Sequence, residues 1–193
     1  MSEEAIKQIL LEIEKENAVD ETGELREGLR NTPKRVVESW AELYSGYKQN
    51  PKETLNATFN GEGYDGIVLL KDIEFYSTCE HHMLSFTGKA HVAYIPTERI
   101  VGISKLARIV EIYARRLQNQ ERITNQVAQF LQDSLEPQGV AVVLKARHMC
   151  MEMRGVKTSD TNTITSKLLG SFKKDERTRA EFLNLIGNHR NLV

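Results

Sequence analysis

The sequence predicts an α+β fold in which an antiparallel sheet packs against helices. Three observations lead to this prediction. Stretches rich in β-branched and aromatic residues recur along the chain, two stretches of helical periodicity follow one another between them, and strands and helices do not alternate regularly. Regular alternation would favour a parallel sheet, so its absence indicates an antiparallel layer fold.

Length and composition are those of one globular domain with a helical appendage. The chain has 193 residues, of which 40% are hydrophobic and 27% are charged. The formal net charge of −1 gives no global field for nucleic acid or an acidic membrane, so any anion must bind locally. The acidic start lacks a signal peptide's apolar core, and no apolar run nears the roughly 20 residues of a membrane span. We therefore expect a cytoplasmic protein with neither nucleic-acid nor membrane partners.

Two helices are predicted in the N-terminal quarter. Residues 3–16 carry apolar residues at helical spacing among Glu and Lys, which indicates an amphipathic packing helix. Thr32 and Pro33 are typical of an N-cap and a first helical position. Arg35 falls in the first turn of that helix, where a cation opposes the helix dipole. It either pairs with a local acid such as Glu38 or contacts something else, and the residues alone favour a solvated side chain.

Extended structure begins after a turn-rich stretch at 47–66. Residues 67–76 combine an apolar run with alternation, and residues 88–95 suit a second strand that Pro96 ends. The segment between them is therefore predicted to connect two strands.

A helix is predicted after Gly102-Ile103-Ser104 from an apolar stripe that runs from Leu106 to Leu117, with Ser104 as the expected N-cap. Lys105 and Arg108 then lie three residues apart on the first turn, beside N–H groups without intrahelical partners. Together these groups suit a phosphate chain. The alternative is an ordinary capped helix with solvated basic side chains.

The last third of the chain combines helices and strands. A second helix is expected from residue 120 to Pro137, with Glu121 near its N-terminus, where a carboxylate is stabilised whatever else it does. Strands are predicted over 140–150 and 161–172, and Asp175 is expected to cap a final helix.

The chemically unusual segment is Cys79-Glu80-His81-His82. The one other cysteine, Cys150, follows His148 by two residues, and on a strand over 140–150 both side chains would share a face. A Cys-x2-His pair completed by a distant cysteine fits a zinc-like site with three protein ligands and a fourth position open, as in catalytic zinc sites. Taken singly, each thiol reads as a buried small hydrophobe. A disulfide is the second alternative, which a reducing compartment disfavours.

Hydrolysis is the chemistry these residues suggest. A zinc ion with an open position generates hydroxide from water near neutral pH. His81 and His148 would flank the metal as proton shuttles. Glu121 could accept from the N1–H and exocyclic amine of a guanine. The residues alone therefore indicate zinc-dependent hydrolysis of a small anionic molecule.

Several separated motifs now point to a family. They are Thr32-Pro33-Lys34-Arg35, Ser77-Thr78-Cys79-Glu80-His81-His82, Gly88-Lys89-Ala90 through Tyr94-Ile95-Pro96, Gly102-Ile103-Ser104-Lys105-Leu106-Ala107-Arg108, Gln120-Glu121-Arg122, and His148-Met149-Cys150 through Arg154-Gly155. In order and spacing they resemble type I GTP cyclohydrolase, a zinc enzyme of the T-fold family. The resemblance runs from about residue 30 to the C-terminus.

The resemblance implies an architecture. A T-fold is an antiparallel sheet with helices on one face, and here it would occupy residues 51–193 as the catalytic domain after an N-terminal helical segment over 1–50. The family assembles as a homodecamer of two pentamers, with active sites between subunits.

The resemblance also implies a reaction and a set of roles. GTP and water would give formate and 7,8-dihydroneopterin triphosphate, the first step of pterin and folate biosynthesis, through attack of zinc-activated water on C8 of the purine. One Zn²⁺ per subunit would be held by Cys79, His82 and Cys150, while His81 and His148 move protons in steps that stay unassigned. The implied substrate contacts are Glu121 and Gln120 for the guanine, Ser104, Lys105, Arg108 and Arg154 for the triphosphate, and Arg35 from a neighbouring subunit.

Two other functions remain open at this point. A related T-fold enzyme could act on another purine or pterin, since fold does not fix function. A GTP- or zinc-binding module without turnover is the second, against which the presence of both His81 and His148 counts. Asn119, within the Gln-x-Gln-Glu-Arg run, is interpreted as a free position.

Overall fold

A five-stranded sheet forms the core of the larger of two compact units in the structure, a computed structural model that describes residues 2–187. The strand order is β5-β2-β3-β6-β7, and the four long strands all pair antiparallel, as predicted, whereas the short β5 runs parallel to β2. The strands are β2 (Val68–Cys79), β3 (Ser85–Ile95), β5 (Leu117–Gln118), β6 (Gly139–His148) and β7 (Thr163–Gly170).

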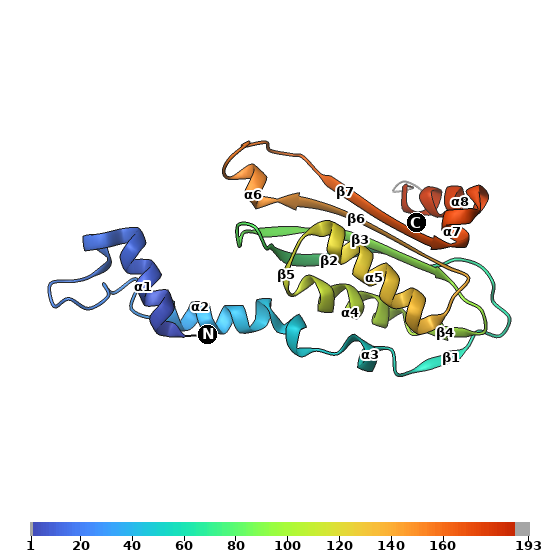
Figure 1. The fold of residues 1–193 in the computed structure, drawn as a ribbon, viewed down its shortest axis with the longest axis horizontal. Helices are drawn as coiled ribbons and strands as arrows, with labels where there is room; N and C mark the ends of the chain where they lie inside the picture. Colours follow the sequence, from blue (N-terminus) through green and yellow to red (C-terminus); the bar gives the residue numbers. More distant parts are fainter. Residues whose placement is uncertain (1, 188–193) are drawn as a thin grey trace, which may run out of the picture. The chain divides into compact units, whose positions relative to one another are not determined.

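Two long helices, α4 (Ile103–Ala114) and α5 (Gln120–Leu135), cover one face of this sheet (Figure 1). Side chains of a strand alternate between its two faces, so every second residue of β3 and β6 points at these helices. The core between the layers is fully buried at Val92, Tyr94, Leu131 and Leu144. Burying one leucine side chain of this kind contributes about 1.5–3 kcal/mol, so this layer contact makes a large contribution to the stability of the fold.

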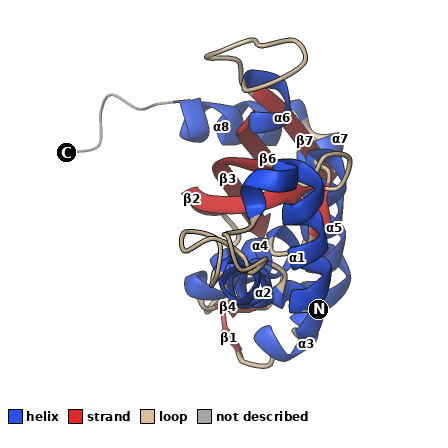
Figure 2. Cartoon of the chain, turned by 90° about the vertical axis from the view of Figure 1, so that its left-hand side faces the viewer, coloured by secondary structure: helices blue, strands red, loops and turns tan. Residues whose placement is uncertain are grey.

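The C-terminal helices α7 (Ser171–Lys174) and α8 (Glu176–Gly187) pack on the opposite face of the sheet. Phe172 and Phe182 are fully buried there against alternate residues of β3 and β6, and their rings meet edge to face. Figure 2 shows the strands between this pair and α4. The T-fold prediction of helices on one face thus describes α4 and α5, and α7 and α8 add a second, smaller core.

Residues up to Ser45 form a separate compact unit, described here by itself. It contains α1 (Glu3–Glu14), a 3₁₀ helix (Lys15–Ala18) and α2 (Thr32–Leu43). Arg26 joins the segment between them to α1 through two contacts of 2.8 Å with the Glu14 carboxylate. Both predicted helices are confirmed, although α2 begins at Thr32 itself, with Asn31 before it.

The stretch predicted as a turn-rich loop holds short elements instead. A 3₁₀ helix (Ser45–Lys48) and α3 (Pro51–Thr54) precede β1 (Thr58–Asn60), which pairs antiparallel with β4 (Arg99–Val101) in a small sheet of its own. Three-residue strands are too short for periodicity to reveal, because their pairing depends on contacts across some 40 residues.

Two further local predictions were wrong. Ser104 is not the N-cap of α4, since the helix begins at Ile103 after Gly102 and no side chain caps it. The strand predicted over 140–150 ends at His148, and α6 (Met149–Glu152) follows, so Cys150 lies in a helical turn. The cap of the last helix is confirmed: the Asp175 carboxylate accepts from the Arg177 N–H at 2.9 Å.

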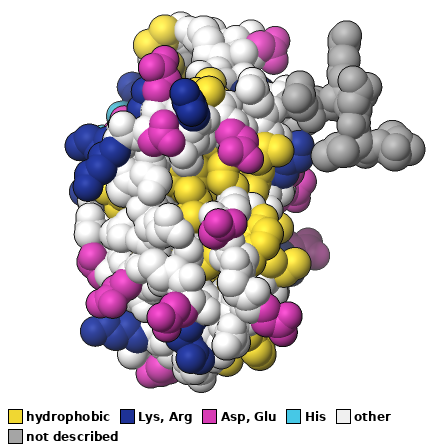
Figure 3. All heavy atoms as spheres, turned by 90° about the vertical axis from the view of Figure 1, so that its right-hand side faces the viewer, with side chains coloured by type: hydrophobic (Ala, Val, Ile, Leu, Met, Phe, Trp, Pro, Cys, Tyr) yellow, Lys and Arg dark blue, Asp and Glu magenta, His cyan; other side chains and the backbone are white. Residues whose placement is uncertain are grey.

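The surface carries charges of both signs. On the face in Figure 3, acidic and basic side chains are interspersed with apolar patches. Of the helices in residues 2–187, none is long and apolar enough to cross a membrane.

Candidate metal centre and substrate site

A tight turn at the end of β2 exposes the two adjacent histidines. Cys79 donates its N–H to Leu84 at 2.8 Å, and its carbonyl accepts from Met83, also at 2.8 Å, which closes the hairpin to β3. Met83 adopts a positive φ of 54° to complete the turn. Cys79 is therefore buried at the strand end, while His81 and His82 project from the tip.

The end of β6 brings Cys150 to this turn. Because β6 runs antiparallel to β3, His148 lies opposite Phe86, the second residue of β3. The chain then turns into α6, which carries Cys150 back towards Cys79. The ligand atoms of Cys79, His82 and Cys150 all lie within 4.8 Å of one another.

The donor set fits a zinc ion. Two thiolates and an imidazole are ligands that zinc prefers, and within residues 2–187 no further His, Cys, Asp or Glu joins the three. Burial raises the pKa of the Cys150 thiol, and the adjacent Cys79 thiol raises it further. The Cys150 thiol therefore resists ionisation by itself, and a bound cation would reverse that preference. Arg154 lies beside the group, with Nη1 3.0 Å from Nε2 of His82.

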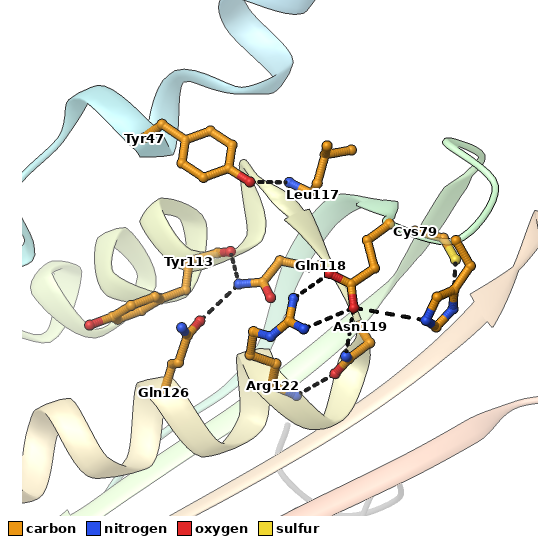
Figure 4. A network of polar contacts seen from close by, with 10 residues as sticks. Tyr47, Cys79, Tyr113, Leu117, Gln118, Asn119, Arg122 and Gln126 are labelled. Carbon is orange, nitrogen blue, oxygen red and sulfur yellow. Dashed lines mark hydrogen bonds and ion pairs between the residues drawn. The ribbon is translucent and has the colours of Figure 1, made fainter.

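His81 sits between a thiol and a carboxylate. Its Nδ1 is 3.8 Å from Sγ of Cys79, and its Nε2 is 3.8 Å from Oε1 of Glu80. Glu80 is in turn held by the Arg122 guanidinium, which contacts both carboxylate oxygens, and by the Asn119 amide at 3.1 Å (Figure 4). The hydrogen bond from Arg122 lowers the pKa of Glu80, so the carboxylate beside His81 stays ionised.

His148 is held on one ring face and at one nitrogen. Its imidazole stacks on Phe86 with ring centroids 4.6 Å apart and planes 4° apart. Nε2 lies 2.8 Å from Oε1 of Gln120, the first residue of α5. Burial lowers the pKa of His148, whereas the negative charge of Glu121 raises it. The imidazole is therefore more readily neutral than a solvated histidine.

Glu121 and Gln120 point in different directions, although both were expected to hold a guanine. Glu121 is exposed and lines a hollow of about 190 Å³ together with Thr124 and three residues of β7. Gln120 is 1% exposed, and its amide is bonded inside the protein. The carboxylate is thus accessible to a ligand and the amide is not.

The expected phosphate cradle, formed by Ser104, Lys105 and Arg108, lies at the end of α4 that is far from the metal group. The metal group is Cys79, His82 and Cys150. Ala114, the last residue of α4, accepts a hydrogen bond of 2.7 Å from Ser77, two residues before Cys79, which places the C-terminal end of α4 beside the metal group. Ser104, Lys105 and Arg108 occupy the N-terminal turns of this 12-residue helix. At 1.5 Å per residue the helix is roughly 18 Å long, so one chain keeps the two sets of residues apart.

Lys105 and Arg108 line a separate hollow of about 450 Å³ with polar residues of the segment 48–56. Arg35 lies in the first turn of α2, in the N-terminal unit, and is exposed. The structure therefore brings together Cys79, His82, Cys150, His81, His148 and Arg154 within one chain, with Glu121 close to His148, and it does not bring the cradle to them.

Comparisons with known proteins identify the family of this chain. The family model described as GTP cyclohydrolase I matches residues 2–187. The chain belongs to the GTP cyclohydrolase I family. Proteins named GTP cyclohydrolase 1 from Synechococcus sp. (strain JA-2-3B'a(2-13)) and from Wolinella succinogenes are each 56% identical over 161 residues. The matched residues are 83% of this chain and 70% and 86% of those relatives.

Among solved structures, one described as the archaeosine synthase QueF-Like in the apo form has a TM-score of 0.46 and 18% identity. It covers 54% of this chain and 94% of its own. That likeness is too distant to add to the family assignment. The antiparallel sheet under α4 and α5 agrees with the T-fold predicted for a GTP cyclohydrolase I.

Sequence reasoning missed the residues that support the two histidines. Asn119, interpreted as free, caps α5 by accepting from the Arg122 N–H at 2.8 Å and also donates to Glu80. Phe86 was not singled out at all. The Asn four residues before a helical apolar pattern was the one available signal, since Asn is a preferred N-cap. The pairing of Phe86 with His148 depends on the register between β3 and β6, and no short sequence motif indicates it.

Proposed function

We propose that this chain catalyses the GTP cyclohydrolase I reaction, in which GTP and water give formate and 7,8-dihydroneopterin triphosphate. Family membership supports the reaction. The single observation that supports it within the chain is the convergence of Cys79, His82 and Cys150, from segments some 70 residues apart, next to two histidines that are not needed as ligands.

Cys79, His82 and Cys150 are the residues that would hold a zinc ion, one per subunit. When bound with an open coordination position, zinc supplies Lewis-acid activation of water near neutral pH. Cys79 is buried and His82 exposed, so the group lies where the protein surface meets the hairpin core. Such a location admits a solvent molecule or a substrate atom from one side.

The two remaining histidines are suited to proton transfer. Opening a purine imidazole ring and releasing formate requires protons to be taken from water and delivered to ring nitrogens. His81 is exposed and contacts both Cys79 and Glu80, whereas His148 is half-buried and favours its neutral form. The neutral imidazole of His148 can accept a proton, and His81 is a second candidate for proton transfer beside the metal ligands.

Substrate recognition is assigned to charged side chains. The Glu121 carboxylate would accept from the N1–H and exocyclic amine of guanine, two donors that this base presents side by side. Lys105 and Arg108, with Ser104, would hold the triphosphate, helped by Arg154 next to His82 and by Arg35. Gln120 is buried and bonded within the protein, so it would influence this region through His148 and not through a direct contact with the guanine.

The separation along α4 supports a site shared between subunits. The proposed cradle and metal group lie at opposite ends of one helix, so a neighbouring copy would place its cradle next to this chain's metal group. We therefore propose a homo-oligomer, a decamer of two pentamers as the resemblance implies, with residues 51–193 as the catalytic domain. A cytoplasmic location is part of the same proposal, because the thiols of Cys79 and Cys150 are free and persist in reducing compartments.

The test is direct. Purified protein supplied with zinc and GTP should release formate and yield a pterin that becomes fluorescent on oxidation, in equal amounts. Glu121→Gln, which keeps the shape of the side chain and removes its charge, should raise KM for GTP. Failure of the unmodified protein to form both products at any zinc concentration would refute the proposed function.

A further inference from the structure

The Gln120 side chain is inserted between two strands at the start of α5. Its Nε2 lies 3.1 Å from the backbone carbonyls of Leu144 in β6 and Thr163 in β7, and 3.1 Å from Oγ1 of Thr165. Thr124 ties the same turn to β7, since its Oγ1 bonds Gln120 O at 2.8 Å and lies 2.7 Å from Oγ1 of Thr165. The amide is therefore fixed in position from three sides.

These contacts decide which way the amide points. A backbone carbonyl can only accept a hydrogen bond, so the atom that faces Leu144 and Thr163 must be the NH₂ group. Its two hydrogens serve the two carbonyls. The amide oxygen then faces Nε2 of His148 at 2.8 Å, and that oxygen can only accept. A hydrogen-bonded distance between these two atoms requires the hydrogen to be on Nε2 of His148.

We propose that Gln120 is a positioning residue that holds His148 as the Nε2–H tautomer, so that Nδ1 is the ring nitrogen left to accept a hydrogen bond from the substrate or from water. The tautomer rests on the structure, and its use in the reaction rests on the proposed function. This role differs from the expectation that Gln120 helps to hold the guanine, because both amide hydrogens and the amide oxygen are already bonded within the protein.

The arrangement decides which ring nitrogen is left as an acceptor. In the Nε2–H tautomer the Gln120 oxygen accepts the hydrogen bond from Nε2, so the free lone pair is on Nδ1. Stacking on Phe86 holds the plane of the imidazole. Among residues 2–187, Nδ1 of His148 has no hydrogen-bonding partner in the structure. The ring therefore presents Nδ1 without turning.

The tautomer is measured without any turnover. In protein labelled with ¹⁵N-histidine and sedimented for solid-state NMR, the shifts of the two ring nitrogens distinguish protonated from unprotonated positions whatever the size of the assembly. His148→Gln identifies the signals that belong to His148. We expect a neutral ring with the hydrogen on Nε2 and none on Nδ1 in the zinc-loaded protein. A neutral ring with the hydrogen on Nδ1 would overturn the proposal.

Gln120→Met tests the consequence for the reaction. Methionine fills about the same space and lacks the amide oxygen that accepts from His148, so both His148 tautomers should be populated. We expect kcat to fall on the order of 10–100-fold, as for other residues that orient a catalytic group through a hydrogen bond. KM for GTP and the zinc content should stay unchanged. A higher KM at unchanged kcat would instead assign Gln120 to guanine binding.

A matched control is available two residues earlier. Gln118 is equally buried, at 1% exposure, and donates 2.9 Å hydrogen bonds to Tyr113 and Gln126 (Figure 4), with no contact to His148. Gln118→Met should cost similar thermal stability but keep the His148 tautomer and kcat. Equal losses of kcat in both variants would mean that Gln120 matters only for folding. An inactive unmodified protein with the Nε2–H tautomer would remove the proposed function and keep the positioning.

Discussion

Two inactive variants of this protein should restore activity to one another when they assemble together. Cys150→Ser removes one of the three proposed metal ligands, and Arg108→Glu reverses a charge in the proposed phosphate cradle. Arg108 is exposed, so its reversal should not affect folding. Each variant alone should be nearly inactive, for unrelated reasons. Recovery on mixing is expected only if the ligand and the cradle of one site come from different chains.

The size of the recovery follows from the structure. The 12 residues of α4 separate the two groups by roughly 18 Å of helix within a chain, so we assign them to neighbouring copies. In a randomly mixed assembly from equal amounts, each site draws its metal group and its cradle independently, and about one quarter of sites receive both intact. The mixture should reach about one quarter of the unmodified activity, with an unchanged KM for GTP.

The assay is formate release after co-expression or co-refolding of the two variants, with native mass spectrometry to show that mixed assemblies formed. Cys150→Ser mixed with His148→Ala is the control, because these residues are two apart in one chain and no mixed site has both intact. That control should stay inactive. Mixed assemblies of Cys150→Ser and Arg108→Glu without recovery would show that one chain supplies the whole site, and the reasoning from α4 would be wrong.

Three further outcomes are expected. Cys150→Ser should lose bound zinc and turnover together, measured by elemental analysis and GTP assay, and retained zinc would reject the ligand assignment. Leu131→Ala empties a fully buried position under the sheet and should lower the free energy of unfolding by about 2–5 kcal/mol in urea titration, with an unaltered KM. Asp175→Asn keeps an N-cap acceptor but cannot ionise. Hydrogen bonds from Arg177 and Thr178 lower the pKa of Asp175 below its ordinary 3.8, so the carboxylate's contribution is present above that pH and is lost as pH falls through the folded value. The difference in Tm between the unmodified protein and Asp175→Asn should shrink below about pH 4, and a constant difference would contradict this origin.

The sequence predicted the metal group through a partly wrong structure. Cys150 was placed on a strand facing the same way as His148, whereas it lies in α6, one turn beyond the strand end. The prediction that Cys150 lies near Cys79 was nevertheless confirmed, because β6 ends beside the hairpin that joins β2 to β3. Ligand spacing of the Cys-x2-His type is a local property, and local properties are what a sequence displays.

The supporting residues could not be predicted in the same way. Gln120 is explained only by two carbonyls and an imidazole that come from β6 and β7, and those partners depend on the register Leu144↔Thr165. Register is set by the burial of whole strand faces, so no short motif contains it. Glu80, read as part of the metal motif, is likewise explained by Arg122 and Asn119, which lie some 40 residues away.

The order of motifs along the chain also could not predict where the cradle lies relative to the metal group. Ser104, Lys105 and Arg108 follow the metal segment in the chain, as the family pattern requires, and that order says nothing about which copy of the chain they serve. Within one chain the helix that carries them is anchored by Ala114 to Ser77 at its C-terminal end, and its rigidity holds its basic N-terminal turns away from the metal group. A helix cannot shorten without losing buried residues such as Ile109 and Val110. The same packing that stabilises the subunit therefore keeps Ser104, Lys105 and Arg108 apart from Cys79, His82 and Cys150, so our proposal that both sets serve one site requires a neighbouring copy to supply one of them.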